Sequence, residues 1–147
     1  MSHTHNPELD LTARCECGAA TLTAKGPVVS MFMCACLNCQ RATGTGHSSV
    51  VLLKTDAVTV VGQTKTYARP ADSGALFTRH FCPQCGTTLY AASSRAPALR
   101  IVPAGLFAGN NDWFEPNQLI FARSRQAWDL IADHLPRHAA YRGELSS

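Results

Sequence analysis

Seven cysteines in three clusters constrain this chain more than any other feature of its sequence. The clusters read Cys15-Glu16-Cys17-Gly18, Cys34-Ala35-Cys36-Leu37-Asn38-Cys39 and Cys82-Pro83-Gln84-Cys85-Gly86. An odd number of cysteines does not fit a disulfide framework, and the first ten residues contain no apolar signal-peptide stretch. We therefore expect a cytoplasmic protein with reduced thiols. Clustered reduced thiols are typical of metal sites.

The number of cysteines in each cluster predicts two metal sites of different kinds. Two pairs supply four thiolates and close a tetrahedral site, which is the arrangement of a structural zinc. A triplet supplies three and leaves a fourth position open, which is the arrangement of a catalytic zinc. We expect two Zn²⁺ ions per chain, a structural one on Cys15, Cys17, Cys82 and Cys85 and a catalytic one on Cys34, Cys36 and Cys39. One structural zinc beside an idle triplet, an iron–sulfur cluster and unliganded buried thiols are the alternatives.

The remaining sequence predicts a mainly β fold in a single domain. The chain has 147 residues, of which 46% are hydrophobic and 16% charged, so it has enough apolar residues for one packed core. The domain is expected over 11–141, between tails at 1–10 and 142–147, and His3 and His5 of the first tail are expected to be solvated. Short β-branched runs separated by turn signals predict strands at 20–23, 28–33, 50–53, 58–61, 64–67, 75–81, 87–90 and 99–102.

One short helix is predicted near the C-terminus. Its apolar face would consist of Ala127, Trp128, Leu130, Ile131 and Leu135, and Pro136 would end it.

Charge and hydropathy exclude two classes of partner. The 13 lysines and arginines exceed the 10 acidic residues by only three, and the arginines are scattered along the chain. A charge excess this small, with no cluster of arginines, argues against a nucleic-acid partner. No apolar run approaches the roughly 18 residues of a membrane span. The sequence gives no indication of an oligomeric state.

The order of the cysteine motifs resembles that of a known family. C-x-C-G at Cys15 is followed by C-x-C-x-x-C-x-R-x-x-G from Cys34 to Gly44, and then by F-C-x-x-C-G-T-x-L from Phe81 to Leu89. Trp128 and the run Asp133-His134-Leu135-Pro136 are similar to the closing segment of that family. The pattern covers about Leu11 to Tyr141 and resembles the glutathione-dependent formaldehyde-activating enzyme family, also known as the centromere protein V/GFA domain.

The resemblance implies a zinc-knotted β-tent fold with short helical segments and the same division of the cysteines between a structural and a catalytic zinc. It also implies a carbon–sulfur lyase activity, the condensation of glutathione with formaldehyde to S-hydroxymethylglutathione. A glutathione-like thiol and a small aldehyde are the expected partners. The chain departs from the pattern at Ala35, where many members have histidine, and at Gln40, where many have a basic residue.

Several side chains near the triplet are candidates for the chemistry. Arg41 follows the triplet by two residues and is the expected cation beside it. Arg69 and Arg79 could meet carboxylates of a glutathione-like ligand. His47 and His80 are candidate proton carriers, and the amides of Thr43-Gly44-Thr45-Gly46 could stabilise developing negative charge.

Two other functions remain open. A zinc-stabilised β module could bind protein partners without catalysis. A thiol-based redox or metal-buffering protein would release zinc when its cysteines are oxidised.

Overall fold

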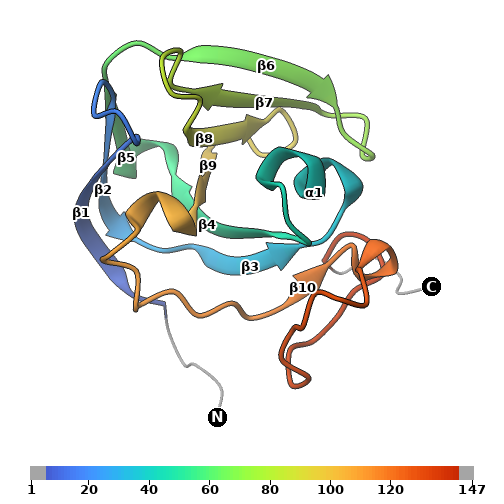
Figure 1. Cartoon of the computed structure of the whole chain (residues 1–147). Coiled ribbons are helices and arrows are strands. Elements are labelled where there is room, and N and C mark those ends of the chain that lie inside the picture. The colour runs from blue at the N-terminus through green and yellow to red at the C-terminus, as the bar shows by residue number, and fades with distance from the viewer. Residues whose placement is uncertain (1–5, 143–147) are drawn as a thin grey trace. The chain divides into compact units, whose positions relative to one another are not determined.

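The computed structural model describes residues 6–142, which form a mainly β structure with one α-helix and short 3₁₀ turns in that range (Figure 1). The chain separates into two compact units. The first takes the described residues of Met1–Val29 and Val51–Trp113, and the second takes those of Ser30–Val50 and Phe114–Ser147. Within residues 6–142, the structure contains no helix with the length and hydrophobicity of a membrane span.

The first unit contains a three-stranded antiparallel sheet. Its strands are β1 (Glu8–Arg14), β2 (Thr21–Pro27) and β5 (Val58–Val61), in the order β1-β2-β5, and the 3₁₀ turn η1 (Thr55–Ala57) precedes β5. Alternate residues of β2 are buried, with Leu22 and Ala24 both fully inaccessible. One face of the sheet is therefore apolar, as the period-2 pattern requires. β1 begins at Glu8, three residues before the expected start of the domain, and the Val28 N–H donates to the Pro7 carbonyl.

Four antiparallel strands of the first unit lie in the order β9-β8-β7-β6. They are β6 (Lys65–Pro70), β7 (Leu76–Phe81), β8 (Thr88–Ser93) and β9 (Leu99–Pro103), and the 3₁₀ turn η2 (Ala104–Phe107) follows them. The loop between β7 and β8 carries the third cysteine cluster (Figure 1). The register shifts between His80 and Phe81, directly before that loop.

The second unit is organised around β3 (Ser30–Cys34), α1 (Leu37–Thr43), β10 (Leu119–Ile120) and the 3₁₀ turn η3 (Ala122–Ser124). β10 pairs with β3 in parallel, with Ile120 opposite Cys34. Leu119, Ala35, Ile131 and Leu135 form a buried apolar cluster. β4 (Ser48–Lys54) begins in this unit and ends in the other.

The structure confirms the mainly β prediction and corrects one element. Observed strands overlap each of the expected runs, but the predicted helix at 127–135 is wrong, because this segment consists of turns. Its apolar residues do not share a face: Leu130 is 90% and Trp128 64% exposed, whereas Ile131 and Leu135 are buried. Hydrogen bonds from Leu119 N to the Pro136 carbonyl and from His138 N to the Leu119 carbonyl hold the following segment extended against β10. The single domain expected over 11–141 stays a prediction.

Candidate metal centres

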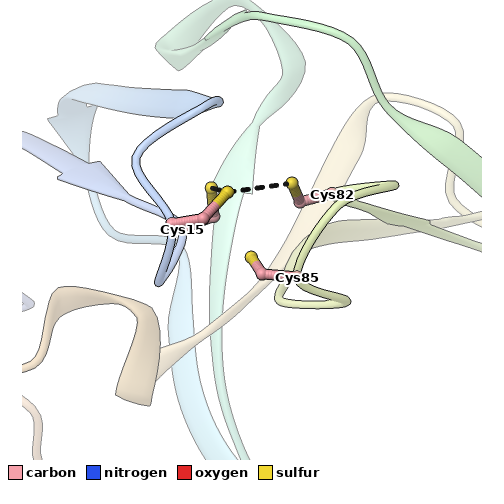
Figure 2. Close-up of side chains that lie close together, drawn as sticks. Cys15, Cys82 and Cys85 are labelled. Carbon is pink, nitrogen blue, oxygen red and sulfur yellow. Dashed lines mark hydrogen bonds between the residues drawn. The ribbon is translucent and has the colours of Figure 1, made fainter.

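The four cysteines of the first and third clusters converge from two loops of the first unit. Cys15 and Cys17 follow β1, and Cys82 and Cys85 lie between β7 and β8. The four sulfurs all lie within 4.8 Å of one another. Cys17 Sγ is 3.7 Å from Cys15 Sγ and 3.7 Å from Cys82 Sγ. Figure 2 shows Cys15, Cys82 and Cys85 pointing into the same small space from the two loops.

Local backbone geometry accounts for this convergence. Gly18 and Gly86 follow the two pairs with φ of 84° and 80°, the left-handed conformation that favours glycine. The turn at Gly18 directs the Ala20 N–H onto Cys15 Sγ at 3.3 Å. Thr87 connects the two loops, since its hydroxyl accepts a hydrogen bond from the Glu16 N–H at 3.1 Å and lies 3.2 Å from Cys85 Sγ. The hydrogen bond with Thr87 lowers the pKa of Cys85 to about 5.

The triplet occupies a strand-to-helix junction in the second unit. Cys34 ends β3, Cys36 is the N-cap of α1, and Cys39 lies in the first turn of that helix. The Cys39 N–H donates to Cys36 Sγ at 3.3 Å, so the C-x-x-C spacing here is the spacing of a helix cap. The three sulfurs lie within 4.8 Å of one another, and no fourth Cys, His, Asp or Glu of the described residues joins them.

Interactions within the triplet favour the protonated thiols when no cation is present. Hydrogen bonds with Cys36 and Cys39, together with burial, raise the pKa of Cys34 well above its ordinary value. Cys39 receives a hydrogen bond from Cys34 that lowers its pKa, but its contact with Cys36 and its burial outweigh this and raise the pKa to about 11. Three thiolates this close together and partly buried need a cation between them.

Both clusters fit a tetrahedral ion bound by sulfur. A Zn–S bond of about 2.3 Å places two tetrahedral sulfur ligands about 3.8 Å apart. The two 3.7 Å distances in the four-cysteine cluster match this separation and are far longer than a disulfide bond of about 2.05 Å. Each cluster can therefore hold a metal ion, and thiolate ligands select soft or borderline ions.

The amide side chain of Gln40 fixes the triplet's helix, a role that the sequence did not indicate. The Gln40 amide nitrogen donates to the Ala35 carbonyl at 2.9 Å and to the Ser124 carbonyl at 3.0 Å. Its oxygen accepts from Gln126 at 3.2 Å. Gln40 thus ties α1 to the residue that follows β3 and to residues 124–126, which come after β10. Because two of its partners come from residues more than 80 positions away, no local sequence pattern could have indicated this role.

His47 is paired with a carboxylate. Its Nδ1 lies 2.7 Å from Oδ2 of Asp129, and the two side chains are 20% and 11% exposed. The pairing orients the ring and leaves Nε2 free of that interaction. Gly46 makes room for the carboxylate, since a Cβ there would lie 2.7 Å from Cβ of Asp129. The Thr43 hydroxyl lies 2.9 Å from the Cys39 carbonyl and 3.3 Å from the His47 carbonyl, and so connects this loop to the triplet's helix.

The predicted arginines lie in different places. Arg41 is exposed in the last turn of α1, in the unit that holds the triplet. Arg69 and Arg79 lie on β6 and β7 of the other unit, and their guanidinium groups cover the rings of Phe77 and Tyr67 at 4.6 and 5.4 Å.

The two histidines predicted as proton carriers also lie in different units, His47 in the second and His80 in the first. His80 lies on β7, where burial, followed by the charge of Arg100, lowers its pKa. His3 and His5 lie outside the described residues.

Comparisons with known proteins agree with the cysteine pattern. The family model described as glutathione-dependent formaldehyde-activating enzyme matches residues 10–124. The crystal structure of a Rhodobacter sphaeroides protein is similar to this one, with a TM-score of 0.55 and 17% identity. That match covers 69% of this chain and 92% of the other. At this identity the likeness concerns the fold alone.

Proposed function

Because this chain belongs to the glutathione-dependent formaldehyde-activating enzyme family, we propose that it is a zinc-dependent carbon–sulfur lyase. Its reaction would be the addition of a glutathione-like thiol to a small aldehyde, or the reverse. The observation that carries the proposal is the three-sulfur cluster of Cys34, Cys36 and Cys39, which has no fourth protein ligand among the described residues. A purely structural site has no need of an open position.

The two cysteine clusters would have separate roles. Cys15, Cys17, Cys82 and Cys85 would hold a structural zinc ion that ties the loop after β1 to the loop after β7. Cys34, Cys36 and Cys39 would hold the catalytic ion. Zinc bound there would supply an open position at which a substrate thiol loses its proton.

The surrounding residues would position the reactants and move the proton. In the addition, a C–S bond forms between the thiol sulfur and the carbonyl carbon, the C=O π bond breaks, and the carbonyl oxygen takes up a proton. His47, oriented by Asp129 through Nδ1, would carry that proton at Nε2. Arg41, in the last turn of the triplet's helix, would offset the negative charge of the thiolates.

The proposal is tested with glutathione and ¹³C-labelled formaldehyde, by following the rate of adduct formation with NMR above the rate in buffer. Wild-type protein loaded with zinc should accelerate the reaction, and Cys36→Ser should lose nearly all of the acceleration. Ser at position 36 is itself a good N-cap, so α1 should persist. Full turnover by Cys36→Ser would contradict the proposal and leave a zinc-stabilised binding module as the function.

A further inference from the structure

The β7–β8–β9 strands of the first unit bring together three side chains that the cysteine chemistry does not use. His80 and Tyr90 are direct partners across β7 and β8. Ala91 is opposite Ile101, so Arg100 on β9 lies on the same sheet face as Tyr90, one diagonal position away. Three adjacent strands therefore each contribute one side chain to a single patch.

Ring contacts hold the three side chains together around Tyr90. The His80 and Tyr90 rings are stacked, with centroids 4.3 Å apart and planes 13° from parallel. The Arg100 guanidinium lies 5.3 Å from the centre of the Tyr90 ring. Stacking fixes the plane of a guanidinium and leaves its N–H edges available to other groups.

The patch contains donors without an anionic partner. All three side chains are partly buried. Arg100 makes one side-chain hydrogen bond in the described structure, to the Leu99 carbonyl at 3.4 Å. No carboxylate within residues 6–142 pairs with Arg100 or His80, and the Tyr90 hydroxyl has no hydrogen-bond partner in that range. A partly buried guanidinium without a counter-ion lacks the stabilisation that an anion would provide.

We propose that His80, Tyr90 and Arg100 form a binding site for the carboxylate of a small organic ligand. The planar fork of Arg100 matches a carboxylate, and the Tyr90 hydroxyl and a His80 N–H are further donors on the same side. The proposed function enters only through the choice of probe, an S-methylated form of the peptide thiol glutathione that keeps its free carboxylates. Carboxylate recognition is thereby assigned to Arg100, instead of to Arg69 and Arg79.

Calorimetric titration with S-methylglutathione tests this site, because that compound keeps both carboxylates and lacks the free thiol that the triplet would bind. Wild-type protein should bind it, and Arg100→Gln should bind it about tenfold to a hundredfold more weakly, as expected for loss of a charge-assisted pair. Tyr90→Phe should weaken binding by a smaller factor. The dimethyl ester should bind wild-type protein weakly and lose no further affinity in Arg100→Gln.

Matched variants separate this site from general charge effects. Lys25→Gln removes one positive charge from the exposed side of β2 and should change the affinity less than twofold. Arg79→Gln removes a guanidinium that also covers a tyrosine ring and lies next to His80 on β7. It should weaken binding less than Arg100→Gln does. Arg100→Lys keeps the charge and loses the fork, and it replaces Arg100→Gln if that variant does not melt like wild type.

The inference would be overturned if Arg100→Gln bound S-methylglutathione with wild-type affinity. It would also be overturned if Arg79→Gln lost more affinity than Arg100→Gln, or if the wild-type protein did not bind the compound. None of these results depends on turnover or on Cys36. The carboxylate site can therefore fail while the thiol chemistry stands, and the reverse also holds.

Discussion

At the scale of single residues, the triplet's surroundings depend on side chains that leave little room for change. Gly46 is the clearest case, because the Asp129 side chain occupies the space that a Cβ would need. The same carboxylate orients His47. A small residue here is therefore a requirement of the His47–Asp129 pair.

Gly46→Ala should destabilise the protein by roughly 1–3 kcal/mol, as overpacking of a filled space does. It should also slow adduct formation, because Asp129 must move away from His47. Gly105→Ala is the matched control, since a Cβ at Gly105 meets no atom within 4 Å and should leave the free energy of unfolding nearly unchanged. Denaturant unfolding curves measure both effects. Equal stability of the two variants would show that the loop can shift without cost.

Residue types and spacing were enough to predict which cysteines lie together. Both predicted groups are the groups in which the sulfurs converge. The partners of His47 and Gln40 could not be predicted, because Asp129 and Ser124 are brought to them by tertiary packing. The patch around Tyr90 depends on the β7–β8–β9 register, which the sequence pattern does not determine.

At the scale of elements, α1 is a short helix whose position is set by side-chain hydrogen bonds. Seven residues are too few for a helix to be stable on its own propensity. None of its residues is fully buried, so apolar packing contributes little. The Cys36 cap at its start, the left-handed Gly44 at its end and the Gln40 amide hold it in place.

Gln40→Ala should therefore lower the free energy of unfolding by about 1–3 kcal/mol, because partly buried carbonyls lose their donor. It should also weaken metal retention by the triplet without affecting the four-cysteine cluster. Gln63→Ala is the control, since this exposed side chain makes no hydrogen bond in the described structure. Urea titration and metal analysis after dialysis measure the two effects. Unchanged metal content in Gln40→Ala would contradict the role assigned to the amide.

Element types were predictable where the periodicity was strong and where no distant partner intervened. The β-branched runs became strands, as expected. The helix expected around Leu130 did not form, because only Ile131 and Leu135 of its proposed face reach the core. β10 was not predicted, since two residues give no period and its parallel pairing with β3 is non-local.

At the scale of the whole molecule, the two proposed metal sites lie in different compact units. The four-cysteine cluster lies within the first unit and the triplet within the second. The apparent free energy of binding a structural zinc ion is about 10–16 kcal/mol. The net stability of a domain is roughly 5–15 kcal/mol, so loss of that ion should be enough to unfold the chain.

The measurement that tests this division most directly is the metal content of Cys36→Ser and Cys82→Ser, with a thermal melt of each. Cys36→Ser should contain one zinc ion fewer than wild type and still melt cooperatively, because the closed cluster is intact. Cys82→Ser should lose the cooperative transition. A cooperative melt in Cys82→Ser, or its loss in Cys36→Ser, would contradict the assignment of one cluster to the fold and the other to the reaction.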